Sequence, residues 1–181
     1  AVIRHFRPQR IIEVGSGVST RCMLAALKTN QQEDGRPVSL ACIEPYPSAA
    51  LRSLPGIELI SQKVQTVPFS RFCELQENDF LFIDSSHTVK PGSDVNYLIL
   101  EVLPRLHPGV VVHFHDIYLP YDYSPATLQT FFHWMETSLL RAFLIENRRA
   151  RVVFSESHLH HDCKDALKEV FPEYRPQRDK D

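Results

Sequence analysis

The stretch from residue 11 to residue 20, IIEVGSGVST, constrains the fold of this 181-residue chain more than any other. A short, mainly apolar run with Glu13 near its end is followed by two glycines, one residue apart. Glycine permits a tight turn and lets a ligand approach the backbone closely. Ser19 or Thr20 is expected to cap the helix that follows the turn. This order of strand, glycine turn and helix predicts a small-molecule pocket at the carboxyl end of a parallel strand.

Strand and helix patterns alternate along the rest of the chain. We expect strands at 10–14, 39–43, 57–60, 79–83, 110–114 and 151–155, with helices at 19–30, 48–54, 68–75, 94–106 and 127–146 and a further helix from 161. Most of these strands are near-continuous apolar runs, as expected where helices cover both faces of a sheet. The sequence therefore predicts an α/β fold with a mainly parallel, doubly wound sheet.

Composition narrows the class of protein further. The chain has neither an internal repeat nor a low-complexity linker, so we expect one domain over 1–181, with a core at about 8–155 and a C-terminal extension at 156–181. A net charge of -2 gives no electrostatic argument for binding nucleic acid or an anionic membrane. No apolar run approaches the length of a membrane span. Four cysteines without a C-x-x-C pair predict a reduced, cytoplasmic chain.

Several ligands are compatible with a lone glycine turn. A dinucleotide fingerprint would have a third glycine or alanine where this chain has Thr20, and its acidic residue would lie about 20 residues on, nearer than Glu44. A P-loop would need a lysine that is absent here. A turn with a purely structural role stays open.

The motif EVGSGVST, followed by Glu44 after the second strand, resembles the class I S-adenosylmethionine-dependent methyltransferases. The resemblance implies a Rossmann-like three-layer sandwich and a cofactor site made by Glu13, Gly15, Ser16, Gly17 and Glu44. A carboxylate suits the cationic sulfonium and amino groups of this cofactor, and the two oxygens of one carboxylate match a ribose diol.

The motifs LFIDSSH and HFHDI extend the resemblance, over about 8–155, to a subgroup that includes small-molecule and sugar O-methyltransferases. It implies transfer of a methyl group from S-adenosyl-L-methionine to a small-molecule acceptor, at a hydroxyl oxygen. The chain departs from the family after the third strand, where an acidic residue often lies near the adenine. Gln62 or Gln65 could bind the adenine instead.

The acceptor side is expected at the ends of the fourth and fifth strands. Asp84 ends one and Asp116 ends the other, and His87 and His115 crowd the same edge. We expect His87, His115 and Asp116 to be catalytic, because a neutral histidine takes up a proton near pH 7. Asp84 is expected to contact the cofactor. Asp84 and Asp116 together could hold Mg2+ or another divalent cation that orients the hydroxyl. His113 is expected to be a core residue.

Two other functions stay open. The chain could be a catalytically inactive methyltransferase-like domain that binds or assembles within a larger protein. A histidine and carboxylate edge could also hold iron for oxygen chemistry, which we favour less. The run 158–163, HLHHDC, has the composition of a metal site, but its spacing fits no standard zinc pattern. We interpret this run as a polar edge.

Overall fold

The computed structural model describes residues 1–131 and 134–175. The chain forms two compact units, Ala1–Asp116 and a second that begins at Ile117. The single domain expected over the whole chain stays a prediction.

The first unit contains all five strands of the sheet. They are β1 (Arg10–Val14), β2 (Ser39–Ile43), β3 (Glu58–Ile60), β4 (Phe80–Ile83) and β5 (Val111–Phe114). Its helices are α1 (Val2–Phe6), α2 (Val18–Asp34), α3 (Ala49–Arg52) and α4 (Asp94–Asn96), with 3-10 turns at Val64–Thr66 and Phe69–Glu74. The helix that begins as α4 continues through a π-helical segment, Tyr97–Val102, and ends in a 3-10 turn, Leu103–Arg105. The strands lie where the sequence predicts them, to within a residue.

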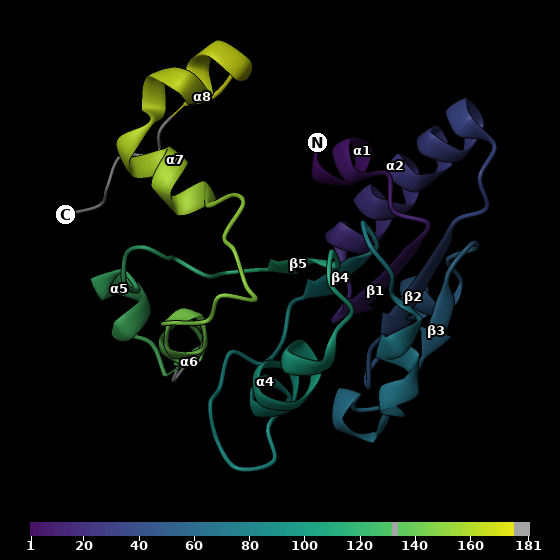
Figure 1. The fold of residues 1–181 in the computed structure, drawn as a ribbon, viewed down its shortest axis with the longest axis horizontal. Helices are drawn as coiled ribbons and strands as arrows, with labels where there is room; N and C mark the ends of the chain where they lie inside the picture. Colours follow the sequence, from purple (N-terminus) through teal and green to yellow (C-terminus); the bar gives the residue numbers. More distant parts are fainter. Residues whose placement is uncertain (132–133, 176–181) are drawn as a thin grey trace. The chain divides into compact units, whose positions relative to one another are not determined.

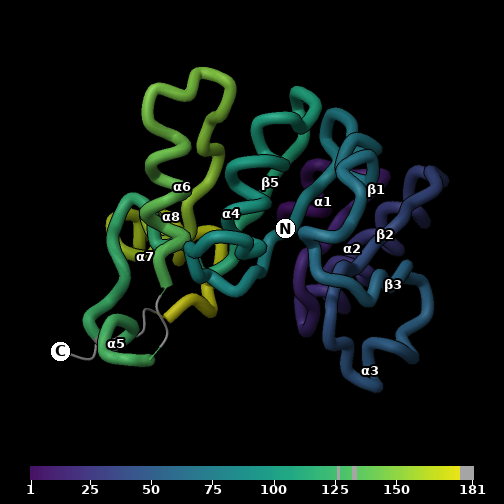
Figure 2. The backbone as a smooth tube through the Cα atoms, turned by 90° about the horizontal axis from the view of Figure 1, so that it is seen from below, coloured from purple at the N-terminus to yellow at the C-terminus, as the bar shows by residue number. Residues whose placement is uncertain are grey.

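The five strands pair in the order β3-β2-β1-β4-β5, and every pair is parallel. Figure 1 shows α1 and α2 on one side of this sheet and the α4 helix on the other, and Figure 2 shows β1, β2 and β3 side by side from a second direction. The chain therefore has the Rossmann-like, doubly wound α/β fold that the sequence predicts. The order reverses between β1 and β4, and ligands bind at such a switch point in open α/β sheets.

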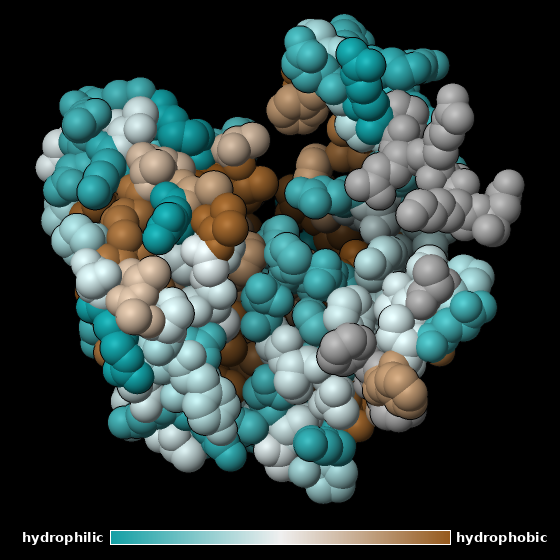
Figure 3. All heavy atoms as spheres, turned by 180° about the vertical axis from the view of Figure 1, so that it is seen from behind, coloured by the Kyte–Doolittle hydropathy of each residue, from teal (hydrophilic) through white to brown (hydrophobic). Residues whose placement is uncertain are grey.

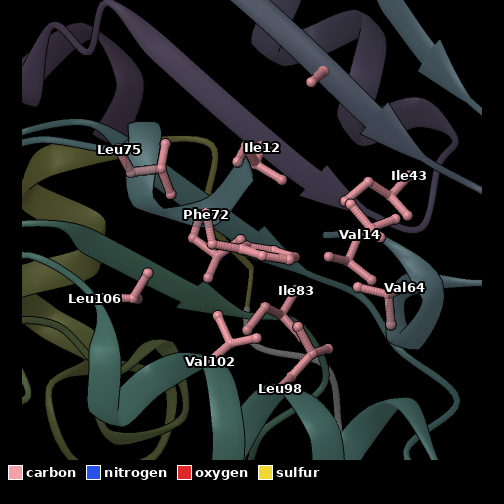
Figure 4. Close-up of a cluster of buried hydrophobic side chains, with 13 residues drawn as sticks. Ile12, Val14, Ile43, Val64, Phe72, Leu75, Ile83, Leu98, Val102 and Leu106 are labelled. Carbon is pink, nitrogen blue, oxygen red and sulfur yellow. The ribbon is translucent and has the colours of Figure 1, made fainter. Parts of the chain in front are cut away.

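The side chains of the strands alternate between two apolar clusters, one on each face. Ile12 and Ile83 point to the α4 side, where Phe72 lies at the middle of the cluster (Figure 4). Leu98 and Val102 close this cluster from the helix. The burial of such side chains stabilises the fold by about 1.5 to 3 kcal/mol each.

The opposite face is packed under α1 and α2. Ile11 and Phe82 point to this side and meet Met23 and Leu27 of α2. The ring of His113 stacks on Phe82 at 4.6 Å between centroids, with the planes 6° apart. His113 is only partly buried and packs against the core aromatic ring of Phe82, so the expectation of a core residue is met only in part.

In its described residues, the second unit contains four short helices, α5 (Pro125–Leu128), α6 (Glu136–Leu144), α7 (Glu156–Asp162) and α8 (Lys164–Val170). The single helix predicted at 127–146 is wrong, since α5 ends at Leu128 and α6 begins at Glu136. Ser124 caps α5 by accepting the Thr127 N–H at 3.3 Å, so a separate helix begins here. Part of the predicted range, 132–133, lies outside the described residues.

The predicted sixth strand at 151–155 is also wrong. This segment has no regular secondary structure, and Val152, Val153 and Phe154 are 59%, 67% and 57% exposed. Its β-branched and aromatic residues favour an extended chain, but a strand also needs a neighbour for its backbone groups. The helix predicted from 161 corresponds to α8, which begins at Lys164, whereas α7 before it was not predicted; the two helices meet at Cys163.

Hydrophilic residues cover most of the face drawn in Figure 3, with hydrophobic patches between them. Across the described ranges, no helix combines the length and the apolar character that crossing a membrane requires.

Candidate functional site

Gly15 makes the turn after β1 possible. Its φ is +95°, and a Cβ on this residue would lie 2.4 Å from the carbonyl oxygen of Asp84. Its N–H donates to the Ile43 carbonyl at 3.0 Å, which ties the turn to the end of β2. The turn after β1 thus lies directly against the backbone that ends β4, and only glycine fits there.

The start of α2 is stabilised differently from the expectation that Ser19 or Thr20 caps it. Gly17 is the N-cap residue, and the Thr20 hydroxyl accepts its N–H at 3.0 Å. The Ser19 hydroxyl instead donates to Glu13 at 2.7 Å. A Cβ on Gly17 would meet nothing within 4 Å. The first turn of α2 therefore presents open backbone where a ligand could lie.

Glu13 lies beneath this turn and is fully buried. One carboxylate oxygen accepts the Ser19 hydroxyl, and the other accepts the Cys42 thiol at 3.0 Å. Cys42 is the register partner of Glu13 on β2, so their side chains leave the same face of the sheet. Burial raises the pKa of Glu13, against the opposing effect of these hydrogen bonds, and burial also raises the pKa of Cys42. Glu13 holds the turn in place from below.

The raised pKa of Glu13 has a consequence for stability. The folded state binds this proton more tightly than the unfolded state, so the contribution of Glu13 to stability is fully present below the ordinary value of 4.5 and is lost as pH rises through the folded pKa. In the Glu13→Gln variant we expect this loss, at most about 1.4 kcal/mol per pH unit, to be absent. Urea unfolding between pH 4 and 8 measures it. The same change at exposed Glu101 controls for the loss of one negative charge; a Glu13→Gln profile parallel to the wild type would contradict the prediction.

A pocket of about 410 Å³ opens at the turn after β1 and the segment after β2. It is lined by Ser16, Gly17, Val18, Arg21, Glu44, Tyr46, Ser48, Ala50, Leu51 and Leu54. Glu44 accepts the Tyr46 N–H at 2.8 Å on one oxygen and the Ser16 hydroxyl at 3.3 Å on the other. Each oxygen keeps further acceptor capacity. Of the predicted cofactor residues, the pocket brings together Ser16, Gly17 and Glu44.

Glu13, Gly15 and Asp84 do not line this pocket. Both glycine and glutamate act on the pocket indirectly. Glu13 supports the turn after β1 from within the sheet, and Gly15 allows this turn to form. Of the two glutamines considered for adenine, Gln65 donates to the Gly92 carbonyl at 3.0 Å, and Gln62 is exposed. Neither lines the pocket.

The acceptor-side residues are brought together by the sheet ladder, which continues past the strand ends. The Asp84 N–H donates to the Val14 carbonyl at 2.9 Å, and the His115 N–H donates to the Ile83 carbonyl at 2.8 Å. These bonds bring the residues that follow β4 and β5 to one edge of the sheet, next to the Gly15 turn.

Two histidines and two carboxylates interleave at this edge. His87 Nε2 lies 3.6 Å from Asp84 Oδ1 and 3.9 Å from Asp116 Oδ2. His115 Nδ1 lies 3.2 Å from Asp116 Oδ1 and 3.9 Å from Asp84 Oδ1. His87 is 6% exposed, whereas the side chain of His115 is 47% exposed. The structure therefore brings together all four residues that the sequence places on the acceptor side.

The backbone of this cluster is strained. His87 and Asp116 have φ values of 56° and 55°, in a region that costs a non-glycine residue about 1 kcal/mol or more. The hydroxyl and N–H of Ser86 donate to Asp94 at 2.6 and 2.8 Å, which holds the loop that carries His87. The neighbouring His87 imidazole lowers the pKa of Asp84, with partial burial acting in the opposite direction. Asp84 is thereby kept ionised beside the histidines.

A metal site is not formed by these groups. Within 1–131 and 134–175, no set of three or more histidine, cysteine, aspartate or glutamate side chains is arranged to hold a metal ion. The carboxylates of Asp84 and Asp116 face imidazoles instead. The divalent cation expected at Asp84 and Asp116 stays a prediction, and no step of the chemistry below uses one.

Several residues of the site were missed by the sequence reasoning. Arg21 and Tyr46 line the pocket, and Cys42 and Ser19 fix Glu13. Arg21 lies one turn after Gly17 on α2, so helical periodicity could have placed it near the pocket. The contact of Cys42 depends on the register of β1 with β2, for which the sequence carries no local signal.

Comparisons with known proteins found one family and one relative. A protein family described as "Methyltransferase domain" matches residues 12–117, which is more than half of the chain. An uncharacterized protein from Archaeoglobus fulgidus is 45% identical over 84 residues, which cover 43% of this chain and 36% of that protein. The match thus spans about a third of that relative. No solved structure matches the chain significantly.

Proposed function

Because the chain belongs to this methyltransferase domain family, we propose that it transfers a methyl group from S-adenosyl-L-methionine to a hydroxyl oxygen of a small molecule. The observation that carries the proposal is the position of the Glu44 pocket beside the edge where Asp84, His87, His115 and Asp116 converge. The cofactor and acceptor sites of one reaction would occupy neighbouring strand ends. When bound, the cofactor supplies an electrophilic methyl group on a sulfonium.

The pocket suits the nucleoside part of this cofactor. Its volume of about 410 Å³ lies within the range of about 300 to 1,000 Å³ typical of small-molecule sites. The acceptor oxygens of Glu44 would take the two ribose hydroxyls, and the ring of Tyr46, with the residue 80% exposed, would lie against the base. The open backbone at Gly17 would take the polar end of the ligand.

The histidines supply the base that a hydroxyl acceptor needs. Asp116 and Asp84 both face Nδ1 of His115, which favours a proton on that nitrogen and leaves Nε2 as an acceptor. Nε2 would take the proton from the hydroxyl as the methyl group arrives, and the carboxylates would stabilise the imidazolium. His87 is more deeply buried than His115, and it positions Asp84.

Isothermal calorimetry with S-adenosylhomocysteine, the demethylated product of this cofactor, tests the proposal. We expect saturable binding of one molecule per chain with a Kd below about 100 µM. Methyl transfer from labelled cofactor is then assayed over a panel of hydroxyl compounds. If the folded protein releases no binding heat at millimolar ligand, the proposal is wrong. If it binds but methylates nothing, the inactive binding domain is supported instead.

Replacing the proposed ribose ligand should weaken the cofactor specifically. For Glu44→Ala we expect the Kd for S-adenosylhomocysteine to rise about 10- to 100-fold, because hydrogen bonds to a charged group contribute about 1.5 to 3 kcal/mol. Calorimetry measures the Kd. Glu101→Ala is the control, since Glu101 is exposed and pairs only with Arg105 among the ion pairs described. An unchanged Kd in Glu44→Ala would remove Glu44 from the site.

A further inference from the structure

Helices α7 and α8 follow one another in the other unit (Figure 1). A second group of reactive side chains lies where they meet, at Cys163. His158 and Asp162 are one helical turn apart on α7, and His158 Nδ1 lies 3.2 Å from Asp162 Oδ2. The other ring nitrogen, Nε2, lies 3.8 Å from Cys163 Sγ. A thiol, an imidazole and a carboxylate therefore form a chain in the order used by cysteine nucleophiles.

The backbone explains how Cys163 reaches His158. On a continuous helix, residues five apart point in different directions. Cys163 leaves the helical conformation, with φ -124° and ψ 38°, and ends α7 there. This break turns its side chain back toward the imidazole.

The carboxylate is itself held in place. The Tyr121 hydroxyl donates to Asp162, which lowers the pKa of Asp162 and raises the pKa of Tyr121 to about 12. His161 contacts the Tyr121 ring edge-on at 4.7 Å. Asp162 is therefore ionised at neutral pH, and an ionised acceptor at Nδ1 keeps the proton there and leaves Nε2 to accept from the thiol.

We propose that Cys163 is a nucleophilic thiol, activated by His158 and Asp162, that exchanges with small disulfides such as glutathione disulfide. His158 Nε2 takes the thiol proton, and Sγ attacks one sulfur of the disulfide. The disulfide bond breaks, a mixed disulfide forms on Cys163, and the departing thiolate takes the proton from His158. His158 and Asp162 are about half exposed and Cys163 is partly exposed, so a tripeptide disulfide reaches them from solvent.

The chain contains its own reference thiol. Cys22 is exposed on α2, and no histidine or carboxylate contact to it is described. If exposure alone set the rate, Cys22 would react at least as fast as the partly exposed Cys163. The proposal predicts the reverse order, so the two thiols distinguish activation from access.

The experiment incubates the full chain with glutathione disulfide at pH 7 and follows each cysteine by peptide mass spectrometry. We expect Cys163 to form the mixed disulfide about tenfold faster than Cys22. His158→Gln should slow Cys163 about tenfold, and Asp162→Asn about threefold, with the rate of Cys22 unchanged in both. A Cys163 rate equal to or below that of Cys22 in the wild type would overturn the proposal, whatever the variants do. So would a full Cys163 rate in His158→Gln.

Discussion

The Gly15→Ala variant is expected to lose about 2 to 4 kcal/mol of unfolding free energy. Two costs add at this position. A left-handed φ of +95° costs an alanine about 1 kcal/mol, and its Cβ would lie 2.4 Å from the Asp84 carbonyl oxygen, so the backbones of the β1 turn and the β4 end must separate. Urea denaturation of the purified variant measures the loss.

Gly35→Ala is the matched control for this prediction. Gly35 ends α2 with a φ of +68°, but nothing lies within 4 Å of the Cβ position. It therefore incurs the conformational cost of about 1 kcal/mol without the clash. The difference between the two variants isolates the close approach of Gly15 to Asp84. If Gly15→Ala and Gly35→Ala lose the same unfolding free energy, the turn after β1 does not contact the end of β4 as closely as described.

The His115→Ala variant is expected to transfer methyl groups about 100- to 10,000-fold more slowly than the wild type. This is the usual contribution of a positioned general base, and His115 is the more exposed of the two histidines beside Asp84 and Asp116. The rate is measured with labelled cofactor and the hydroxyl compound that the wild type methylates fastest. The Kd for S-adenosylhomocysteine should change less than threefold, since His115 does not line the cofactor pocket.

The control here is His107→Ala, because His107 is exposed and lies before β5, at the opposite edge of the sheet. We expect wild-type rates from it. The pH dependence of the methyl-transfer rate distinguishes a general base from a residue with only a structural role. A hydroxyl that ionises unaided reacts faster at high pH, so the deficit of His115→Ala should shrink as pH rises. A constant deficit at every pH, or a loss below threefold at pH 7, would contradict the assignment of His115 as the base.

Much of the first unit follows from local sequence signals. The apolar runs at β1, β2, β4 and β5 identify buried parallel strands, and the ends of β4 and β5 correctly bring Asp84 and Asp116 together. Parallel topology forces residues that follow neighbouring strands to one edge. Four side chains from two distant segments could therefore be grouped before any coordinates were known.

Features that depend on tertiary partners could not be predicted in the same way. The segment 151–155 has strand-forming residues but no place in the sheet, because propensity does not specify a partner strand. Burial of Glu13 follows from its neighbours Ser19 and Cys42 rather than from the motif that contains it. The hydrogen bonds of Asp94 to Ser86, which hold the His87 loop, require knowledge of the fold of that loop.

The strand order also separates the pocket from the histidine and carboxylate cluster, which bears on how the two could change independently of each other. The pocket belongs to the segments after β1 and β2, whereas the histidine and carboxylate cluster belongs to the segments after β4 and β5. The two halves adjoin at the Gly15 turn and the backbone of Asp84. Exchange of the segment between Ser86 and Asp94 would alter the surroundings of the histidine and carboxylate cluster and spare the residues that line the pocket. Under the proposed function, a change of acceptor would therefore require changes in the segments after β4 and β5 and none in the residues that line the pocket.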